Sequence, residues 1–308
     1  MTKVFIDGSA GTTGLRIRER LSARKDIALL SIPDDLRKDE NARREMINSA
    51  DIVFLCLPDA AAIEAVKLCA NGSTCIIDTS TAHRVSDGWE YGFPELSGRR
   101  ERIRTSKRIA NPGCHASGFI ALTAPLVETK MIPEDTFLCC FSLTGYSGGG
   151  KKMIAEYEDP DRDCLLDAPR LYGLSQEHKH LPEMTAVAGL SVQPAFMPVV
   201  APFYSGMEVV VPLPAKTLKG TARDVGELYS RYYSEGMVRY VPDAAENGFM
   251  SAGSYAGKDT MELTVTGNGE RILLVARFDN LGKGASGAAI QNMNVVLGVP
   301  EDTGLVRG

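Results

Sequence analysis

The sequence predicts an α/β protein: a Rossmann-like domain with a doubly wound parallel sheet, joined to a second α+β domain with a mixed, largely antiparallel sheet. Three observations predict this class. Short apolar runs alternate with amphipathic stretches through the first third of the chain, a glycine-rich turn follows the first run, and longer strand patterns come after residue 114. Near-continuous apolar strands separated by helices are typical of a parallel sheet covered on both faces.

The elements of the first domain are predicted in the order strand, helix, strand. Leu15 to Leu21 is part of the first helix. The strands are expected at 4–6, 27–32, 52–57, 75–78 and 108–110. Each is a short apolar run bounded by turn or charged residues, which is the pattern of a buried strand.

The second domain is predicted to hold longer strands and fewer helices. Ala116 to Val127 has the pattern of an apolar helix, and strands are expected at 136–143, 207–211, 261–266 and 271–278. Gly267-Asn268-Gly269 joins the last two as a hairpin. Residues 285–298 form a helix that returns to the first domain. We therefore divide the chain into 1–113 with 285–308, and 114–284.

Composition narrows the classes of function. The chain has 308 residues, of which 44% are hydrophobic and 24% charged, and no apolar run approaches the roughly 18 residues of a membrane span. Its 34 basic and 39 acidic residues give a net charge of −5, so no broad basic surface exists for nucleic acid. We expect a small-molecule substrate, with neither nucleic acid nor membrane as partner.

The glycine-rich turn predicts a dinucleotide site. Gly8, Gly11 and Gly14 form G-x-x-G-x-x-G directly after the first strand. The first glycine permits a tight turn, the second lets the backbone approach a pyrophosphate, and the third allows close packing of helix on strand. An ordinary glycine-rich turn is the alternative, but the position after the first strand favours a cofactor. The expected contacts include Thr12 and Thr13.

The end of the second strand bears on the choice between NAD and NADP. No acidic residue ends that strand directly, where Ser31 lies, and Arg37 and Lys38 follow shortly. The absence of an acidic acceptor for the ribose hydroxyls favours NADP. Asp34 and the neighbouring Asp35 argue the other way, and a solvated surface is an alternative for the basic pair.

Cys114 is the candidate nucleophile among seven cysteines. An odd number leaves at least one thiol outside intrachain disulfides, and the N-terminal apolar run is too short for a signal peptide, so we expect a reducing cytoplasm. Asn111-Pro112-Gly113 is a turn that delivers Cys114 to a helix start, where backbone N–H groups stabilise a thiolate. The others are interpreted as bystander thiols: Cys56, Cys69, Cys75, Cys139, Cys140 and Cys164.

A thiolate beside a nicotinamide can displace phosphate from an acyl phosphate and hold the acyl group as a thioester for reduction to an aldehyde. The reaction also needs an acid/base group, and the chain has four histidines, at 83, 115, 178 and 180. His115 adjoins Cys114 on one helix, so the two side chains should diverge. His83 follows a buried strand and stays a possibility.

The segment around His178 and His180 is more suggestive. Pro182 disfavours helix at Leu181, and an extended segment would place both histidines on one face with Glu183 nearby. His-x-His is also a metal-ligand pair, but neither a third ligating histidine nor a Cys-x-x-Cys motif accompanies it, so we expect acid/base use and no metal. A solvated loop is the alternative for one histidine.

Six motifs together closely resemble the N-acetyl-gamma-glutamyl-phosphate reductases of arginine biosynthesis, which are relatives of aspartate-semialdehyde dehydrogenase. The motifs span nearly the whole chain, at 8–14, 78–84, 111–114, 144–152, 178–183 and 283–294. The chain length and the Ser-Gly-Gly-Gly-Lys-Lys motif resemble those of the shorter type of this reductase. One departure is His115-Ala116, where the longer type often has an aromatic residue and proline.

The resemblance implies a Rossmann domain that binds NADPH and a catalytic, dimerising α+β domain, assembled as a homodimer or homotetramer. It implies Cys114 as nucleophile and His180, ahead of His178, as acid/base. Further cofactor contacts are expected at Ser31, Arg37, Ser80, Asn280 and Gly284. Substrate contacts are expected at Arg84, Ser147, Gly148, Lys151 and Glu183.

The residues around Ser147 suit an anion independently of the resemblance. Successive glycines leave backbone N–H groups open, and Lys151 adds positive charge. A flexible hairpin loop is the alternative there, and a surface ion pair is the alternative for Arg84.

The predicted reaction is NADPH-dependent reduction of N-acetyl-gamma-glutamyl phosphate to the semialdehyde, with release of phosphate. The alternatives are a related aspartate-semialdehyde dehydrogenase and a non-catalytic nucleotide-sensing protein.

Overall fold

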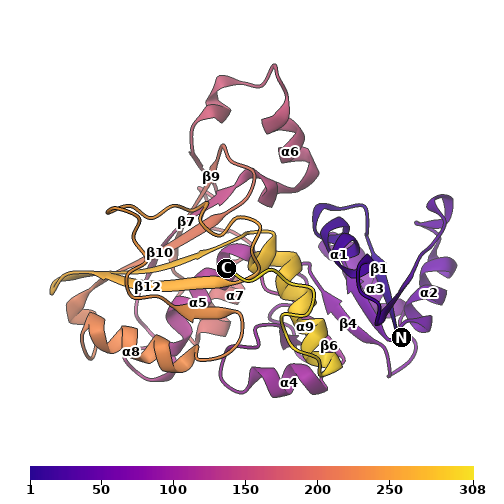
Figure 1. The fold of residues 1–308 in the computed structure, drawn as a ribbon, viewed down its shortest axis with the longest axis horizontal. Helices are drawn as coiled ribbons and strands as arrows, with labels where there is room; N and C mark the ends of the chain where they lie inside the picture. Colours follow the sequence, from indigo (N-terminus) through magenta and orange to yellow (C-terminus); the bar gives the residue numbers. More distant parts are fainter. The chain divides into compact units, whose positions relative to one another are not determined.

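In the computed structural model, which describes residues 1–308, the chain divides into two units (Figure 1). Unit 1 comprises Met1–Pro112 and Ala285–Leu305, and unit 2 comprises Gly113–Gly284 and Val306–Gly308. Residues 306–308, expected with the first domain, lie in unit 2 because their backbone bonds there: the Val306 N–H donates to Asp259 at 2.8 Å and the Gly308 N–H to Thr260 at 3.0 Å.

The predicted parallel sheet of unit 1 is confirmed. Its strands are β1 (Thr2–Asp7), β2 (Ile27–Leu30), β3 (Ile52–Leu55), β4 (Cys75–Asp78), β5 (Glu90–Tyr91) and β6 (Arg108–Ala110). They run in the order β2-β1-β3-β4-β6-β5, and every neighbouring pair is parallel. The register aligns the last residues of four strands, so the turns that follow β1, β3, β4 and β6 lie at one edge of the sheet.

Helices cover both faces of this sheet because side chains alternate along each strand. Ile6 and Ile77 pack on one face with α1 (Thr12–Ser22), α4 (Arg99–Thr105) and α9 (Gly287–Leu297). Phe5 and Ile76 pack on the other with α2 (Glu40–Ser49) and α3 (Asp59–Leu68). The last helix, α9, thus returns to the core of unit 1, as expected.

The sheet of unit 2 is mixed and mostly antiparallel, again as predicted. Its strands are β7 (Cys139–Gly145), β8 (Arg170–Leu171), β9 (Ala195–Ala201), β10 (Met207–Pro214), β11 (Val238–Tyr240), β12 (Met261–Gly267) and β13 (Arg271–Phe278). The order is β11-β12-β13-β10-β7-β9-β8, with parallel pairing only in β11/β12 and β7/β9. The predicted hairpin after Gly267 is present, closed by the Asn268 N–H donating to the Arg271 carbonyl at 2.8 Å.

One face of the unit 2 sheet carries the helices. The apolar helix α5 (Cys114–Glu128) packs on β10 and β13, with α7 (Leu181–Ala188) and α8 (Ala222–Tyr232) beside it, while α6 (Gly150–Glu158) belongs to a projecting segment (Figure 1). β7 begins at Cys139 and not at Thr136, because Thr136 closes a turn on the Pro133 carbonyl.

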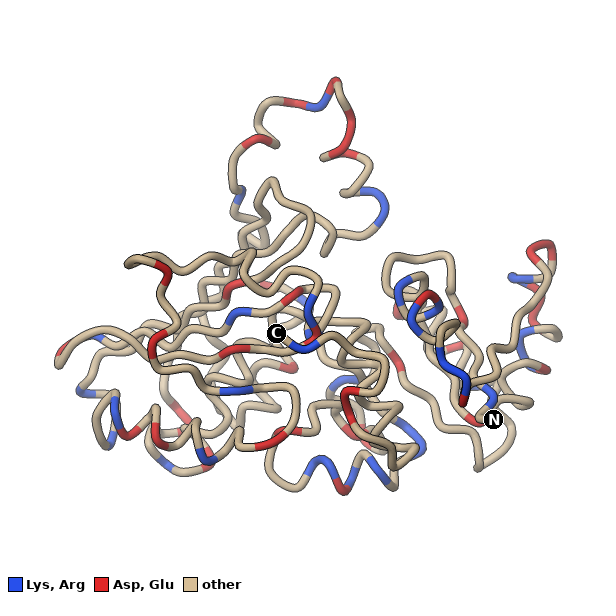
Figure 2. Tube along the Cα trace, in the orientation of Figure 1, with Lys and Arg blue, Asp and Glu red and all other residues tan.

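Charged residues of both signs are interspersed over each unit (Figure 2). None of the helices combines the length and apolar character needed to cross a membrane.

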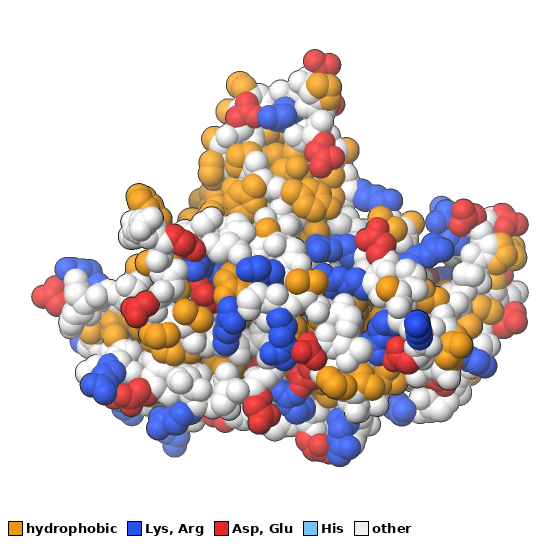
Figure 3. Space-filling view, in the orientation of Figure 1, with side chains coloured by type: hydrophobic (Ala, Val, Ile, Leu, Met, Phe, Trp, Pro, Cys, Tyr) orange, Lys and Arg blue, Asp and Glu red, His pale blue; other side chains and the backbone are white.

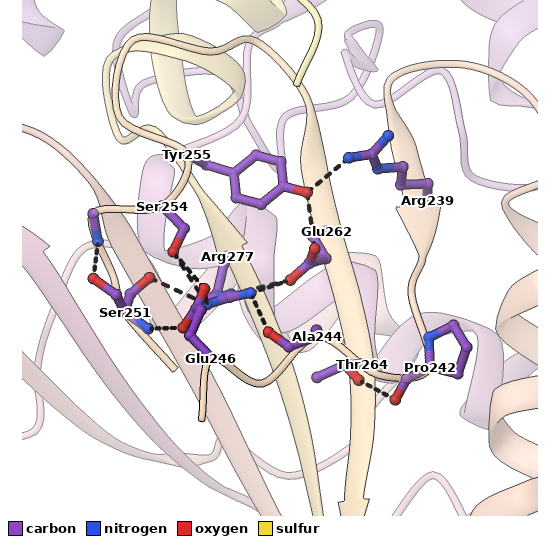
Figure 4. A network of polar contacts seen from close by, with 11 residues as sticks. Arg239, Pro242, Ala244, Glu246, Ser251, Ser254, Tyr255, Glu262, Thr264 and Arg277 are labelled. Atoms are coloured by element: carbon purple, nitrogen blue, oxygen red, sulfur yellow. Dashed lines mark hydrogen bonds and ion pairs between the residues drawn. The ribbon is translucent and has the colours of Figure 1, made fainter. Parts of the chain in front are cut away.

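A buried arginine holds the long loop between β11 and β12 (Figure 4). Arg277 on β13 donates to Glu262 on β12 at 2.7 and 3.0 Å, and to Glu246 of the loop at 2.5 Å. The Tyr255 hydroxyl donates to the other oxygen of Glu262 at 2.8 Å and accepts from Arg239 at 2.9 Å. Every charge in this network has a partner of opposite sign or a hydroxyl.

Arg277→Ala would leave the Glu262 carboxylate buried without its cation. We expect the free energy of unfolding to fall by about 3–5 kcal/mol, measured by urea unfolding followed by circular dichroism. Arg223→Ala, which breaks the exposed pair with Glu227 on α8, is the matched control and should cost about 0.5 kcal/mol or less. Equal losses for the two variants would contradict this structural role.

Candidate active site

Cys114 is the first residue of α5 in unit 2. The preceding Gly113 has extended backbone angles and no side-chain cap, so the first-turn N–H groups and the positive end of the helix are directed at this position. Cys114 is partly exposed, whereas burial raises the pKa of Cys75 to about 11 and that of Cys56 to about 12. None of the seven cysteines is in a disulfide.

A buried carboxylate joins the helix of Cys114 to a histidine. Glu183 in α7 has Oε1 2.5 Å from Nδ1 of His180, and its Oε2 accepts the Gly113 N–H at 3.2 Å. Only 1% of Glu183 is exposed. An ionised carboxylate accepts hydrogen bonds and donates none, so Nδ1 of His180 carries the proton.

The expected extended segment at 178–180 is wrong. Helix α7 begins at Leu181, with His180 as its N-cap residue in a helical conformation and Pro182 in the first turn. Proline is tolerated there because the N–H that it lacks would have no intrahelical partner. The two histidines still lie together through a turn: Nδ1 of His178 accepts the His180 backbone N–H at 3.2 Å, and the ring centroids are 4.9 Å apart.

His178 is electrostatically unlike a free imidazole. Burial, followed by the positive charge of His180, lowers the pKa of His178 to about 4. His178 is therefore uncharged near neutral pH, and its Nδ1 bonds to a backbone N–H and not to a carboxylate.

His115, which the sequence analysis set aside because it adjoins Cys114 on one helix, lies beside the two other histidines. Its ring is buried, Nδ1 lies 2.7 Å from Oγ of Ser142, and Nε2 lies 2.7 Å from the Tyr172 hydroxyl. The ring centroid is 5.7 Å from that of His180 and 6.0 Å from that of His178. A histidine in an otherwise apolar helix was the available signal, because a buried polar side chain needs partners. Ser142 and Tyr172 carried no such signal.

Gly284 packs directly against Cys114. A methyl group at Gly284 would lie 3.0 Å from Cβ of Cys114 and 3.1 Å from the Asp279 carbonyl, which is too close for an unshifted side chain. Gly284 belongs to a π-helical turn, Gly282–Ser286. The buried Asp279 holds this turn by accepting the N–H groups of Leu281 and Gly282 at 2.6 and 3.0 Å.

The Ser147 segment is a 3₁₀ turn, Tyr146–Gly149, that leads into α6. It is therefore not the hairpin loop of the alternative interpretation. Oγ of the buried Ser147 accepts from Nδ2 of Asn280 at 3.0 Å, and Oδ1 of Asn280 accepts the Gly206 N–H at 3.0 Å. Lys151 is exposed in the first turn of α6, and Gly148 faces Asn280 and Thr144 with room for a methyl group.

In unit 1 the three glycines of the turn after β1 have different surroundings. Gly8 has φ +90°, and a methyl group there would lie 2.3 Å from the Cys56 carbonyl oxygen; at Gly14 it would lie 2.6 Å from the Gly8 carbonyl. The fold therefore requires glycine at both Gly8 and Gly14. Gly11 has no protein atom closer than 3.6 Å to such a group, so its small size leaves space above the turn.

Two further features suit an anion at this turn. Oγ1 of Thr12 is buried and has no hydrogen-bond partner, and α1 has no side-chain cap on its first N–H groups. A buried hydroxyl and uncapped helix N–H groups fit the pyrophosphate of a dinucleotide. Thr13 follows in the same turn of α1.

The other predicted residues of unit 1 lie at three places. Ser31 and Arg37 are exposed beyond β2, where Arg37 approaches Asp34 at 3.5 Å. Ser80 follows β4 and donates to Asp78 at 2.7 Å. Arg84 is buried, with Nε donating to the Asn111 carbonyl at 2.9 Å, so it is not the surface ion pair of the alternative interpretation.

Comparisons with known proteins show the family of the chain. Residues 22–106 match the model of the semialdehyde dehydrogenase NAD binding domain, and residues 114–280 match that of the semialdehyde dehydrogenase dimerisation domain. N-acetyl-gamma-glutamyl-phosphate reductase 2 of Nostoc sp. is 43% identical over 98% of this chain and 99% of its own length. The chain belongs to the N-acetyl-gamma-glutamyl-phosphate reductase family. The reductases of Rhizobium etli and Brucella ovis are each 46% identical to this chain. Both alignments cover 96% of this chain, together with 98% of the Rhizobium etli protein and 99% of the Brucella ovis protein.

Solved structures show that this reductase family shares its fold with aspartate-semialdehyde dehydrogenases. The structure of the Francisella tularensis enzyme superposes with a TM-score of 0.71 at 15% sequence identity. The match covers 96% of this chain and 100% of that enzyme's chain. The enzyme of Candida albicans, solved with NADP, matches 96% of this chain and 98% of its own with a TM-score of 0.64 at 15% identity. The solved structures thus show the fold, and the family models identify the NAD binding domain and the dimerisation domain.

Proposed function

We propose that this protein reduces N-acetyl-gamma-glutamyl phosphate to the semialdehyde with NADPH, releasing phosphate, as an enzyme of arginine biosynthesis. The observation that carries the proposal is the joint placement of Cys114 at the start of α5 and of His180 on Glu183, which also binds Gly113. A chain of this family with that arrangement has a nucleophile and an acid/base group in one unit.

Cys114 is the nucleophile in this proposal. Its thiolate attacks the acyl carbon, phosphate leaves with the bonding electrons, and the acyl group remains as a thioester on sulfur. When bound, NADPH would supply the hydride that reduces the thioester carbonyl carbon. His180 donates a proton from Nε2 to the carbonyl oxygen as hydride arrives, which gives a thiohemiacetal. His180 then takes the hydroxyl proton as the carbon–sulfur bond breaks and the aldehyde forms.

His180 suits the acid/base role better than His178. The Glu183 carboxylate stabilises a positive charge on His180 and holds its tautomer, with the proton on Nδ1. His178 has a lowered pKa and is held by backbone, so we assign it to the wall of the site. Glu183 becomes a positioning residue in this proposal, in place of the substrate contact expected from the sequence.

The turn after β1 would hold the pyrophosphate of the cofactor, with space at Gly11, the Thr12 hydroxyl and the N–H groups of α1. We propose NADPH over NADH because no acidic residue ends β2 and Arg37 lies shortly beyond. Arg37 would leave its exposed contact with Asp34 for the 2′-phosphate. Ser31, Ser80, Asn280 and Gly284 stay predicted contacts of the cofactor.

The substrate is proposed to bind at the Ser147 turn. Gly148 leaves room beside Asn280, and Lys151 brings a positive charge to the start of α6, so the two suit an anionic substrate. Arg84 stays a predicted substrate contact, although it also holds the Asn111 carbonyl.

Free thiols on all seven cysteines suit a reducing compartment, and a cytoplasmic location stays a prediction.

A second copy of the chain is proposed to cover the helix-free face of the unit 2 sheet, in a homodimer or in a homotetramer built from such dimers. Phe141 pairs with Val210 and Met197, and Leu273 pairs with Pro212, so these apolar side chains share one face. Phe141 and Leu273 are each 39% exposed. Hydrophobic side chains also gather around α6 (Figure 3). Leu165 and Leu174, which lie between α6 and α7, are among the exposed hydrophobic residues there. Such patches mark contact surfaces.

Phe141→Asp should dissociate this oligomer, because an ionised carboxylate on the apolar face would be buried without a partner. Light scattering after gel filtration should show the variant at half the mass of the wild type, or less. Ile63→Asp is the matched control, since Ile63 is 41% exposed on α3 of unit 1. Wild-type mass for Phe141→Asp would exclude this face.

The function is tested by NADPH formation from N-acetylglutamate semialdehyde and phosphate, with NAD and aspartate semialdehyde as comparison reactants. We expect faster turnover with NADP and with the N-acetylated aldehyde. Cys114→Ser should abolish turnover while NADPH binding, followed by cofactor fluorescence, stays as in the wild type. Cys164→Ser, at an exposed cysteine, should be unaffected.

Near-normal turnover by Cys114→Ser would contradict the mechanism. Faster turnover of aspartate semialdehyde would assign the other substrate. Inactivity with both aldehydes, with intact cofactor binding, would favour a nucleotide sensor.

A further inference from the structure

An arginine of α2 is held at the end of β1, where the glycine turn of unit 1 begins. Nε and Nη2 of Arg43 donate to Oδ2 of Asp7 at 3.1 and 2.8 Å. Asp7 is the last residue of β1 and directly precedes Gly8. The two hydrogen bonds therefore fix the guanidinium of Arg43 beside the turn that is proposed to hold the pyrophosphate.

The helix that carries Arg43 also packs near the end of β2. β2 is the edge strand of the sheet and pairs with β1, with Phe5 opposite Leu30. Ile32, just beyond β2, and Met46 of α2 pack against the same core cluster, which contains Phe5. α2 thus lies over β1 and close to the chain that leaves β2.

This position is the one from which a side chain can recognise the adenosine half of a dinucleotide. When the pyrophosphate lies on the turn after the first strand, the adenosine ribose lies by the end of the second strand. In NADP-binding domains of this kind, a nearby arginine accommodates the phosphate on the ribose 2′ oxygen. Arg43 is held beside the first of these two places by a helix that packs near the second.

Part of the guanidinium of Arg43 is open to a further partner. A guanidinium has five N–H donors, and Asp7 accepts from Nε and Nη2 only. Nη1 makes no hydrogen bond and is not buried. The edge formed by Nη1 and Nη2 therefore has donors left for an anion, and phosphate is a group that such an edge binds well.

Asp7 prepares Arg43 for such a contact. The side chains of Arg43 and Asp7 are 17% and 6% exposed, whereas those of Arg37 and Asp34 are 49% and 90% exposed. An arginine that is already fixed loses less conformational freedom when a ligand binds than one that must leave solvent. Arg43 is therefore better placed than Arg37 to select a phosphate.

We propose that Arg43 binds the 2′-phosphate of NADPH through Nη1 and determines the preference for NADPH over NADH, with Asp7 as its positioning residue. This inference rests on the proposed function only in taking NADPH as the cofactor. Arg37, which approaches from solvent, would contribute less to the preference.

The first test measures the Kd of NADPH and of NADH for the free enzyme by the fluorescence of the reduced nicotinamide. Arg43→Gln should weaken the binding of NADPH about 10- to 100-fold, because hydrogen bonds to a charged group are lost. The Kd of NADH, which has no 2′-phosphate, should stay as in the wild type. Arg44→Gln removes a neighbouring cation that pairs with the exposed Glu40, and this matched control should leave both Kd values unchanged.

An unchanged Kd of NADPH in Arg43→Gln would overturn the inference. An equal loss of affinity for the two cofactors would also overturn it, because Arg43 would then support the turn through Asp7 without binding the phosphate. Neither result would affect the proposed reaction. A wild-type enzyme that binds NADH as tightly as NADPH would contradict the cofactor choice of the proposed function as well.

A second variant separates phosphate binding from the loss of the ion pair. Arg43→Gln combined with Asp7→Asn removes both charges and leaves no carboxylate without its cation. Calorimetry should show weaker binding of adenosine 2′,5′-bisphosphate by this double variant, and unchanged binding of adenosine 5′-monophosphate, which lacks only the 2′-phosphate. Wild-type affinity of the double variant for adenosine 2′,5′-bisphosphate would overturn the inference.

Discussion

The Glu183 carboxylate is the group on which the proposed site depends, because it binds two elements that the proposed reaction needs together. One oxygen holds Nδ1 of His180 and the other holds the N–H of Gly113, the residue before Cys114. A carboxylate that is 1% exposed is costly to bury unless its oxygens are bonded. The same contacts that satisfy this charge therefore orient the histidine and the start of α5.

The surroundings of Cys114 are built from residues that leave space and from residues that hold backbone. Gly284 gives room beside the cysteine, and Asp279 holds the π-helical turn that contains Gly284. Asp279 also accepts from the Ser205 hydroxyl at 3.0 Å and from the Gly257 N–H. Gly257 lies in the loop that Arg277 fixes through Glu246. A charge network in this loop thus supports the turn beside Cys114, the proposed nucleophile.

Sequence patterns predicted the strands and the glycine turn because these depend on local periodicity and chain direction. Strands at 75–78, 108–110 and 271–278 agree with the structure to the residue. The segment before Pro182 was predicted wrongly, since a proline that ends one helix can equally open another and only the tertiary packing of α7 distinguishes the two cases. The contacts of Glu183 with Gly113, and of His115 with Ser142 and Tyr172, join residues far apart in the chain, and no local pattern encodes such pairs.

The most direct measurement is the turnover of Glu183→Gln with N-acetylglutamate semialdehyde, phosphate and NADP. This change keeps the size of the side chain but removes the charge that holds His180. The account predicts a fall in kcat of about 100-fold or more, with unchanged affinity for NADPH, while Glu128→Gln at the exposed end of α5 stays at the wild-type value. A Glu183→Gln enzyme with wild-type kcat would contradict the account.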